Sequence, residues 1–431
     1  MVTMRHRNRA LIARPLVGTV LAGLVAGLLM VAAPSAVAAD GPLNPLNPLI
    51  AQRLHNPRLG TDVALVVIDA ASGSVLASHK ANAMQLPASN MKLVTAVDAL
   101  TALGADTKFT TRVRAGATPA DVILQGGGDP LMSNVDLKDL AAQTAKQLTG
   151  AIAPGQSVVV HVDDTLFAPA SDGPGWTAGY VPSVVASVSA LARINDYKSN
   201  PASLAAKAFA DDLTALGIAS TVGAPVKAED AAATLAQSAG HTVTQAVARM
   251  LSVSENNIAE VLFRHVAHAL GQPTTWDGGR AAAMHVISGL GLTTDGVVLA
   301  DGSGVSREDR LSPTFLAQLV RYVRVTNPAP YASMFADGAM PLSGQTGTLA
   351  AHYGRYTTKH SSCAAGAIRA KTGTLFDTIG LSGIAQSTNG ERIFSILVNN
   401  RPQRFPELAT RQAVDGLAAT ITGCWGAKPA R

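Results

Sequence analysis

The sequence has few charged and few aromatic side chains, which make up 15% and 4% of its residues. With 47% hydrophobic content over 431 residues it can bury a large core, which excludes an intrinsically disordered protein. Runs of Lys and Arg are absent, and so are basic stripes interleaved with aromatic residues. Outside residues 1–39, which hold four arginines and no acidic residue, basic and acidic side chains nearly balance. We therefore expect no nucleic-acid partner.

Residues 1–39 have the three parts of a secretory signal. A basic segment extends through Arg14, an apolar stretch runs from Leu16 to Ala33, and Ala36-Val37-Ala38 precedes Ala39. We expect cleavage near Ala38 or Ala39 and an extracytoplasmic location, in the periplasm or the cell envelope. The apolar stretch is about 18 residues long, which is the lower limit for a membrane-spanning helix. An uncleaved signal that associates the protein loosely with the membrane is therefore the alternative.

Cysteine is nearly absent, since Cys363 and Cys424 are the only two. In an oxidising compartment a disulfide between them is the natural hypothesis. The spacing does not establish the bond, and two unpaired buried thiols are the alternative.

A proline-rich linker is expected over residues 40–50, because its prolines fix φ and remove backbone donors. Beyond it, residues 61–69 and 74–79 have the composition of two strands joined by a turn. Apolar residues recur at helical spacing over residues 88–103, which predicts a largely buried helix. Ser89 would then lie at the start of this helix.

The pattern changes after residue 106. Short β-type runs separated by glycine-rich segments predict an inserted accessory region over residues 107–200. Helical patterns return after it, and the last third combines glycine-punctuated strands with a final helix near residues 406–420. The main domain is therefore expected to comprise residues 51–106 and 201–431.

Ser89-Asn90-Met91-Lys92 is a Ser-x-x-Lys motif at the start of the expected helix. Residues three apart share one helix face, so the Lys92 amine can reach the Ser89 hydroxyl. A desolvated lysine can be neutral enough to accept the proton of that hydroxyl. The spacing by itself is weak, because a serine at a helix start followed by an exposed lysine would give the same letters.

Two further segments strengthen the prediction. Ser254-Glu255-Asn256 supplies a hydroxyl and an amide suited to relaying a proton and holding a substrate amide. Lys371-Thr372-Gly373-Thr374 precedes a strand, and its cation and hydroxyls can bind a carboxylate. Taken separately, these letters also suit a helix cap and a turn. Their order after Ser-x-x-Lys in an exported protein is typical of penicillin-binding proteins and class A β-lactamases.

The sequence resembles the class C low-molecular-mass penicillin-binding proteins, which are D-Ala-D-Ala carboxypeptidases and endopeptidases. The likeness extends from about Thr61 to Asn400, and the long interval between Ser89 and Ser254 suits that family's accessory domains. Further segments similar to its landmarks are Pro87-Ala88-Ser89, Phe109-Thr110-Thr111, Gly126 to Pro130, Asn256-Asn257 with Ala259-Glu260, Asp301 to Gly304 with Ser306-Arg307, and Gly347-Thr348-Leu349.

The resemblance implies an α+β fold of the serine β-lactamase/transpeptidase type, an antiparallel five-stranded sheet flanked by helices with an inserted accessory region. It also implies a serine D-Ala-D-Ala carboxypeptidase, with endopeptidase activity left open, that acts on peptidoglycan stem peptides. β-Lactam antibiotics would be covalent inhibitors, and no metal or organic cofactor would be needed.

Site residues follow from the same resemblance. Ser89 would be the nucleophile and Lys92 its base, with Ser254 and Asn256 relaying the proton and holding the peptide. The terminal carboxylate would be bound by Lys371, Thr372, Gly373 and Thr374. Backbone N–H groups of Ser89 and Thr374 would form the oxyanion hole.

The sequence departs from the family's pattern at two positions. Glu255 stands where the family usually has Asp. His352 stands where an arginine typically follows Gly-Thr-Leu, so no role is carried over to that position.

Three other interpretations are weighed against this one. A serine β-lactamase would share the nucleophile but needs a dedicated base for deacylation, and no Glu-x-x-x-Asn element is placed for it. A zinc D,D-peptidase is disfavoured because HExxH is absent, and two partly buried helical histidines explain His265 and His268. A non-catalytic cell-wall-binding module is the third alternative. Such a module would not need all five of the polar side chains Ser89, Lys92, Ser254, Asn256 and Lys371.

Overall fold

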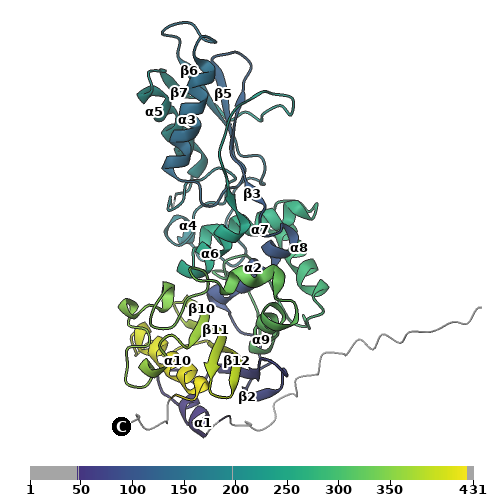
Figure 1. Ribbon diagram of the computed structural model, residues 1–431, viewed down its shortest axis with the longest axis vertical. Coiled ribbons are helices and arrows are strands. Elements are labelled where there is room, and N and C mark those ends of the chain that lie inside the picture. Colours follow the sequence, from purple (N-terminus) through teal and green to yellow (C-terminus); the bar gives the residue numbers. More distant parts are fainter. Residues whose placement is uncertain (1–45, 47, 197, 425–431) are drawn as a thin grey trace, which may run out of the picture. The chain divides into compact units, whose positions relative to one another are not determined.

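The computed structural model describes residues 46, 48–196 and 198–424 (Figure 1). The chain divides into residues 1–37 and residues 38–431, and every described residue belongs to the second unit. The expected signal, residues 1–39, and most of the expected linker lie outside the described residues. The first helix, α1, covers Pro48–Leu54.

A five-stranded antiparallel sheet combines strands from residues 63–79 and 368–398 in the order β10-β11-β12-β1-β2. Val63 of β1 pairs with Val398 of β12, so residues far apart in the sequence are neighbours in this sheet. The strands are β1 (Val63–Asp69), β2 (Val75–His79), β10 (Ile368–Leu375), β11 (Thr378–Ser387) and β12 (Gly390–Val398). This sheet confirms the antiparallel five-stranded sheet that the resemblance implied.

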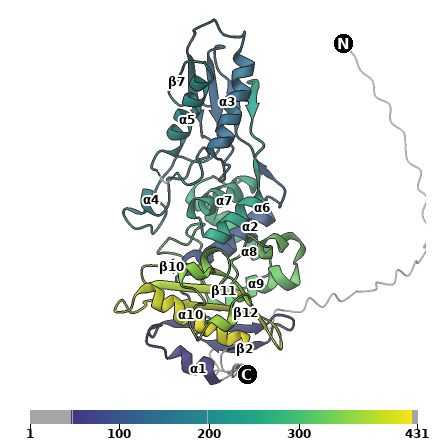
Figure 2. The same cartoon turned by 60° about the vertical axis from the view of Figure 1, so that its left-hand side comes forward.

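Alternate residues of β1 belong to two different hydrophobic cores, as expected for a strand buried on both faces. Leu65 and Val67 pack in the core that includes α1 and α10. Val66 and Ile68 pack in the core that includes α2 and the helices around it. Figure 2 shows α10 lying along β11 and β12. The domain therefore has the α+β architecture that was expected, a sheet covered by helices on both faces.

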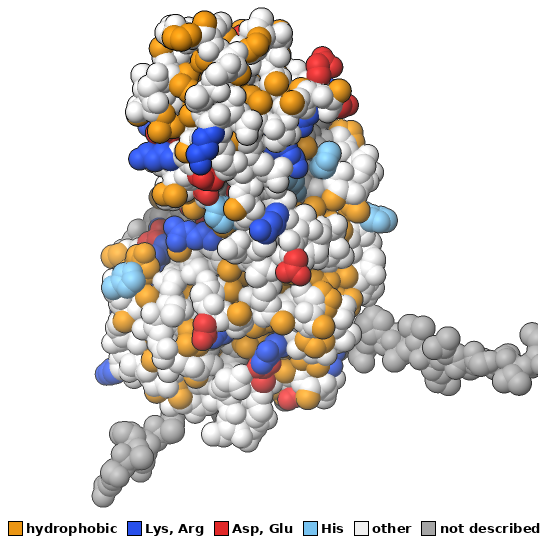
Figure 3. Space-filling view, turned by 45° about the horizontal axis from the view of Figure 1, so that its top comes forward, with side chains coloured by type: hydrophobic (Ala, Val, Ile, Leu, Met, Phe, Trp, Pro, Cys, Tyr) orange, Lys and Arg blue, Asp and Glu red, His pale blue; other side chains and the backbone are white. Residues whose placement is uncertain are grey.

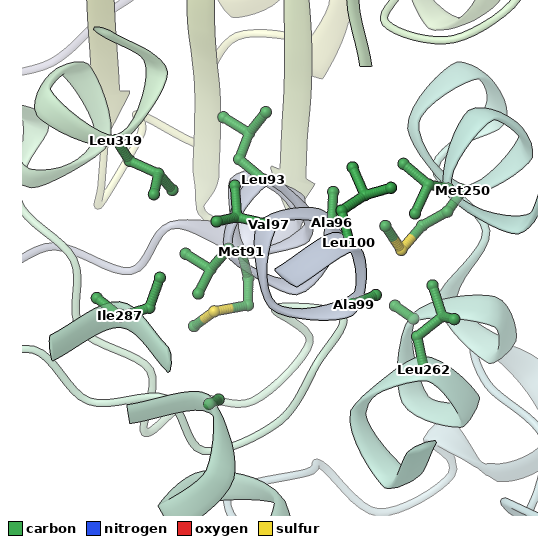
Figure 4. Packing of buried hydrophobic residues seen from close by; sticks show 14 of the residues in the cluster. Met91, Leu93, Ala96, Val97, Ala99, Leu100, Met250, Leu262, Ile287 and Leu319 are labelled. Carbon is green, nitrogen blue, oxygen red and sulfur yellow. The ribbon is translucent and has the colours of Figure 1, made fainter. Parts of the chain in front are cut away.

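Helix α2 lies at the centre of the larger core, and its residues 91–100 are all buried. Small and branched side chains let neighbouring helices pack closely around α2. Figure 4 shows Ala96, Val97 and Leu100 between Met250 and Leu319 of two such helices. The helices of this domain are α2 (Met91–Ala102), α6 (Val243–Val253), α7 (Asn256–Ala269), α8 (Trp276–Gly289), α9 (Pro313–Arg321) and α10 (Glu407–Thr422). Shorter helical segments are η1 (Ala88–Asn90), η2 (Tyr322–Thr326), η3 (Ala329–Phe335), η4 (Gly347–Leu349), η5 (Ala351–Tyr353) and η6 (Ser362–Ala364).

A second five-stranded sheet, in the order β7-β6-β5-β4-β8, has its own hydrophobic core with α3 and α5. It is mixed, because β5, β6 and β7 are parallel while β4 is antiparallel to both of its neighbours. Its elements are β4 (Arg112–Ala115), β5 (Asp121–Gln125), α3 (Asn134–Leu148), β6 (Val158–Asp163), α5 (Pro201–Ala215), β7 (Ser220–Val222) and β8 (Thr234–Gln237). The short helix α4 (Tyr180–Ser183) lies between β6 and α5 in the sequence.

The second sheet extends beyond the boundary expected near residue 200. Ala205, Phe209 and Leu213 of α5 are buried with the side chains of α3, and β8 adds Ala236 to the same core. The pair of β3 (Lys108–Phe109) with β9 (His241–Thr242) joins the chain where it enters and leaves this region. We propose that the accessory region comprises residues 110–240, because the α5 helix belongs to its core and not to that of the main domain.

Cys363 and Cys424 form a disulfide that connects η6 with the end of α10. Figure 3 shows one face of the molecule, on which basic and acidic side chains are interspersed among hydrophobic and uncharged ones. Of the helices that the structure describes, none is both long enough and apolar enough to cross a bilayer.

Candidate active site

Ser89 lies in the 3-10 turn η1, directly before α2. The turn packs closely on the sheet, and glycines make this approach feasible. A Cβ at Gly373 would lie 2.6 Å from the Asn90 Nδ2, and a Cβ at Gly380 would lie 2.2 Å from the same atom. Both distances are well below van der Waals contact, so glycine at these two positions brings Ser89 to the edge strand β10.

Lys92 is completely buried one turn after Ser89. Its Nζ lies 2.9 Å from the Ser89 Oγ, 2.7 Å from the Asn256 Oδ1 and 2.8 Å from the Ser303 carbonyl oxygen. The amide and carbonyl oxygens can only accept hydrogen bonds. A neutral amine can therefore donate its two N–H groups to them and direct its lone pair at the Ser89 hydroxyl.

Burial lowers the pKa of Lys92 to about 8, while the nearby carboxylates of Asp301 and Glu260 oppose a larger fall. Desolvation penalises the charged ammonium, so a substantial share of Lys92 is neutral in mildly alkaline solution. That is the protonation state a general base requires.

Two buried carboxylates fix the loop that carries the Ser303 carbonyl. Glu260 accepts hydrogen bonds from the backbone N–H groups of Gly302, at 3.0 Å, and Ser303, at 2.8 Å. Asp301 accepts from the N–H groups of Gly304 and Ser306. Burial raises the pKa of Glu260 to about 8, and the neighbouring Asp301 charge adds to this rise. Hydrogen bonds to these two side chains thus hold the loop that presents the Ser303 carbonyl oxygen to Lys92.

Ser254 and Asn256 belong to the tight connection between α6 and α7. Ser254 ends α6 in the left-handed region, with φ 63°, and Asn256 begins α7. The Asn256 Nδ2 donates to the carbonyl oxygen of Val184 at 2.9 Å, while its Oδ1 accepts from Lys92. The amide is therefore held in one orientation by two partners.

Lys371 is the second completely buried lysine, in the edge strand β10. Its Nζ donates to the Ser254 Oγ at 2.9 Å and to the Thr372 carbonyl oxygen at 2.7 Å. Burial lowers the pKa of Lys371 well below its usual value, and the neighbouring Lys92 lowers it further. Ser254 thus links the Lys371 segment to the connection between α6 and α7.

An open cleft with about 780 Å³ of empty space lies over these groups. Its lining residues are Ser89, Ser254, Asn256, Thr348, Tyr353, Arg355, Thr372, Thr374 and Arg411. The hydroxyl groups of Thr348 and Thr372, both in the cleft lining, are hydrogen-bonded to each other at 2.8 Å.

The structure brings the expected site residues together, from three segments that are distant in the sequence. Gly373 serves through its lack of a side chain, and the hydrogen-bonding role of the Ser89 and Thr374 backbone N–H groups stays a prediction. Within residues 46, 48–196 and 198–424, no group of three His, Cys, Asp or Glu side chains could hold a metal ion. His265 is buried and bonds the Gly128 carbonyl oxygen, whereas His268 is exposed.

Four lining residues were not predicted as site residues: Thr348, Tyr353, Arg355 and Arg411. Thr348 belongs to the Gly-Thr-Leu segment, so its motif offered a signal. Arg411 lies on the final helix α10, where nothing in the sequence pattern indicated a site. His352 is exposed and is not part of the cleft lining.

Comparison with protein families matches residues 46–194 and 178–421 to the D-Ala-D-Ala carboxypeptidase 3 (S13) family. A D-alanyl-D-alanine carboxypeptidase of Actinomadura sp. (strain R39) is 28% identical over 516 residues, covering 97% of this chain and 91% of the relative. Carboxypeptidase DacB of Mycolicibacterium smegmatis is 28% identical over 391 residues, covering 87% of this chain and 83% of the relative. The resemblance inferred from the motifs is confirmed.

Solved structures share the fold. Penicillin binding protein 4 (dacB) from Haemophilus influenzae matches with a TM-score of 0.72 and 20% identity, over 87% of this chain and 98% of that one. The peptidoglycan endopeptidase Bd3459 from Bdellovibrio bacteriovorus matches with a TM-score of 0.55 and 15% identity, over 84% of this chain and 92% of that one.

Proposed function

The chain belongs to the D-Ala-D-Ala carboxypeptidase 3 (S13) family, and from this premise we propose that it removes the terminal D-alanine of peptidoglycan stem peptides through an acyl-enzyme on Ser89. The observation that carries the proposal is the Lys92 amine, which lies between the Ser89 hydroxyl and two acceptor oxygens. This arrangement supports a nucleophile activated by an adjacent base.

Acylation begins with proton transfer from the Ser89 Oγ to the neutral Lys92 Nζ. The Ser89 oxygen forms a bond to the carbonyl carbon of the penultimate D-Ala, which becomes tetrahedral. The Ser89 and Thr374 backbone N–H groups would stabilise its oxyanion, at roughly 3 to 4 kcal/mol for each donor. When the C–N bond breaks, the proton passes from Lys92 through the Ser254 hydroxyl to the leaving amine.

Two buried lysines in one site affect each other's protonation. Burial lowers the pKa of both Lys92 and Lys371, so the two amines are not both fully in the charged ammonium form near neutral pH. A substrate carboxylate bound beside Thr372 and Thr374 attracts a positive charge to Lys371. The proton then resides there, and Lys92 is left neutral as the base.

Deacylation needs a water molecule, whose oxygen attacks the Ser89 ester carbonyl as its proton moves to Lys92. The ester bond breaks, the Ser89 hydroxyl is restored, and the shortened peptide leaves with a new carboxylate. Apart from this water, residues of the chain supply every reacting group in these steps, so the proposal invokes no cofactor.

Penicillin binding is the second part of the proposal. A β-lactam presents a strained amide and a carboxylate in the arrangement of the peptide terminus, and the same Ser89 would open it to a stable ester. Penicillin binding protein 4 from Haemophilus influenzae shares this fold and has been crystallised with a β-lactam. The partners we propose are therefore stem peptides and β-lactams.

We infer an extracytoplasmic location because peptidoglycan lies outside the cytoplasmic membrane and residues 1–39 have the pattern of an export signal. Attachment to the membrane through an uncleaved signal stays a prediction. Sequencing the N-terminus of the native protein decides between the two forms.

The deciding experiment is release of D-alanine from a peptide ending in D-Ala-D-Ala by the purified protein. We expect release together with a covalent adduct on Ser89 after incubation with penicillin, both seen by mass spectrometry. Absence of D-alanine release would contradict the peptidase. Rapid turnover of penicillin would instead indicate a β-lactamase, and binding of cell wall without either reaction would indicate a binding module.

A further inference from the structure

Arg411 reaches into the cleft from α10, a helix that contributes no other residue to the lining. The Nη2 of its guanidinium group donates to the Thr374 Oγ1 at 3.2 Å. Thr374 follows Gly373 in β10 and lines the cleft with Ser89. Arg411 therefore contacts the segment that is proposed to bind the substrate's carboxylate.

The other arginine of the cleft has its charge satisfied within the fold. Arg355 donates twice to the Asp415 carboxylate, from Nε at 2.9 Å and from Nη2 at 2.5 Å. Both side chains of this pair are almost fully buried. A bidentate pair of this kind is a structural element and has little charge left to offer a ligand.

Arg411 has spare charge and spare hydrogen-bonding capacity. Its ion-pair partner is Glu407, one helical turn earlier, at 2.5 Å, and both side chains remain partly exposed. Pairs of this exposed type hold each other weakly. The buried Nε of Arg411 has no hydrogen-bond partner among the residues that the structure describes. Burial nevertheless lowers the pKa of Arg411, so an anion that enters the cleft stabilises the partly desolvated guanidinium.

We propose that Arg411 binds the C-terminal carboxylate of the substrate directly, together with the Thr374 hydroxyl. The inference rests on the proposed peptidase function and adds a residue that determines specificity for a free carboxylate. Because Thr374 accepts a hydrogen bond from Arg411, its own hydroxyl proton is free to be donated to the carboxylate. The planar guanidinium suits bidentate binding of a carboxylate, a geometry that a lysine ammonium lacks.

In this proposal Glu407 competes with the substrate for Arg411. In the free protein it pairs with Arg411, and the substrate carboxylate competes with it for the same guanidinium. Removing the Glu407 charge leaves Arg411 more available, so substitutions at the two positions have opposite effects on substrate binding.

The test compares two substrates, a peptide ending in D-Ala-D-Ala with a free carboxylate and the same peptide ending in a carboxamide. In Arg411→Ala we expect KM for the free acid to rise roughly 10- to 100-fold with little change in kcat, since a charged hydrogen bond is lost. The carboxamide reaction changes less than about threefold, because that group has no charge to lose. Glu407→Gln lowers KM for the free acid by about two- to threefold, the scale of an exposed ion pair.

Arg404 offers a matched control. It is exposed, its guanidinium stacks over Phe405 at 5.0 Å, and it is not part of the cleft lining. Arg404→Ala removes one positive charge from the same part of the protein and leaves both substrates unaffected. Arg411→Lys keeps the charge without the planar fork, and KM for the free acid rises less than in Arg411→Ala.

The outcomes separate the inference from the proposed function. An equal loss on both substrates, or no loss on either, overturns the role of Arg411 while the peptidase stands. If the unsubstituted protein releases neither D-alanine nor D-alaninamide, the peptidase fails and the inference fails with it. Thermal unfolding of each variant shows whether it folds. If Arg411→Ala does not fold, Arg411→Lys decides, because a selective rise of KM on the free acid supports the inference and unchanged selectivity overturns it.

Discussion

The Lys92 Nζ lies 2.9 Å from the Ser89 Oγ, although Lys92 is completely buried and Ser89 faces the cleft. Residue spacing along the start of α2 provides this contact. The state of the amine depends on what surrounds it, namely the Asn256 amide and the Ser303 carbonyl.

Ser89→Ala removes the nucleophile, and we expect D-alanine release and covalent labelling by a fluorescent penicillin to disappear. The expected loss in kcat is at least about 10⁴-fold, as when a catalytic serine is removed from other enzymes. Gel fluorescence measures the covalent penicillin label, and the unfolding midpoint shows whether the variant is folded. Ser387→Ala is the control, since Ser387 belongs to a Ser-x-Asn sequence outside the cleft. Label persisting on Ser89→Ala would show that another residue is the nucleophile.

The pH dependence of acylation should report Lys92. Because burial lowers its pKa to about 8, the base is protonated below that pH and neutral above it. The acylation rate constant therefore rises as pH increases towards 8 and becomes level above it, which stopped-flow measurements with a chromogenic penicillin can follow. Lys92→Ala should reduce the rate by about 10² to 10⁴-fold. Near-normal acylation in this variant would identify a different base.

Asn256→Asp places a carboxylate where an amide oxygen now lies 2.7 Å from the Lys92 Nζ. An opposite charge at this distance raises a lysine pKa by roughly 1 to 3 units, so the pH profile of acylation should move to higher pH. At neutral pH the rate falls by about 10-fold or more, because less of the amine is neutral. Asn256→Ala removes the acceptor without adding charge and should not move the profile upwards. A shift in both variants would contradict the electrostatic explanation.

His265 should make the fold sensitive to acid. It is buried between Phe109 and Phe167, and its Nε2 bonds the Gly128 carbonyl oxygen at 2.8 Å. Burial lowers its pKa from 6.5 to about 4, so the unfolded chain binds this proton more readily than the folded one. Stability is therefore lost as pH falls from 6.5 towards 4, by about 3 kcal/mol from this group.

The measurement is the unfolding free energy in urea at pH 7 and at pH 4.5. In His265→Gln the difference between the two pH values should shrink, whereas the exposed His268 can be replaced by Gln without this effect. An unchanged pH dependence in His265→Gln would refute the assignment.

The disulfide between Cys363 and Cys424 should stabilise the domain without taking part in the reaction. It closes a loop of sequence separation 61, and neither cysteine lines the cleft. Replacing both by serine should lower the unfolding free energy by about 2 to 4 kcal/mol while D-alanine release at room temperature continues. Thiol titration of the unfolded, unreduced protein should find no free thiol, and two free thiols would contradict the bond.

Local sequence patterns gave good predictions where a single element decides the outcome. The helix predicted over residues 88–103 is observed as the 3-10 turn η1, Ala88–Asn90, followed by α2, Met91–Ala102, and Ser89 and Lys92 meet because they are three residues apart. Strands β1 and β2 agree with the predicted segments 61–69 and 74–79 within two residues. Lys371 to Thr374 were expected to precede a strand, but they lie within β10, Ile368–Leu375. In contrast, helix α5 was assigned to the main domain, because an apolar face shows that a helix packs but does not show which core it packs against.

The sequence by itself determined the chemical groups of the site and the local elements that carry them, since helix spacing and strand alternation depend only on neighbouring residues. The tertiary structure decided which of those groups meet: packing of the α6–α7 connection against β10 brings Ser254 to Lys371, and the final helix brings Arg411 to Thr374. It also decided that Lys92 is buried, and burial is a property of contacts between distant segments. The protonation state on which a base depends is therefore not encoded in any short motif.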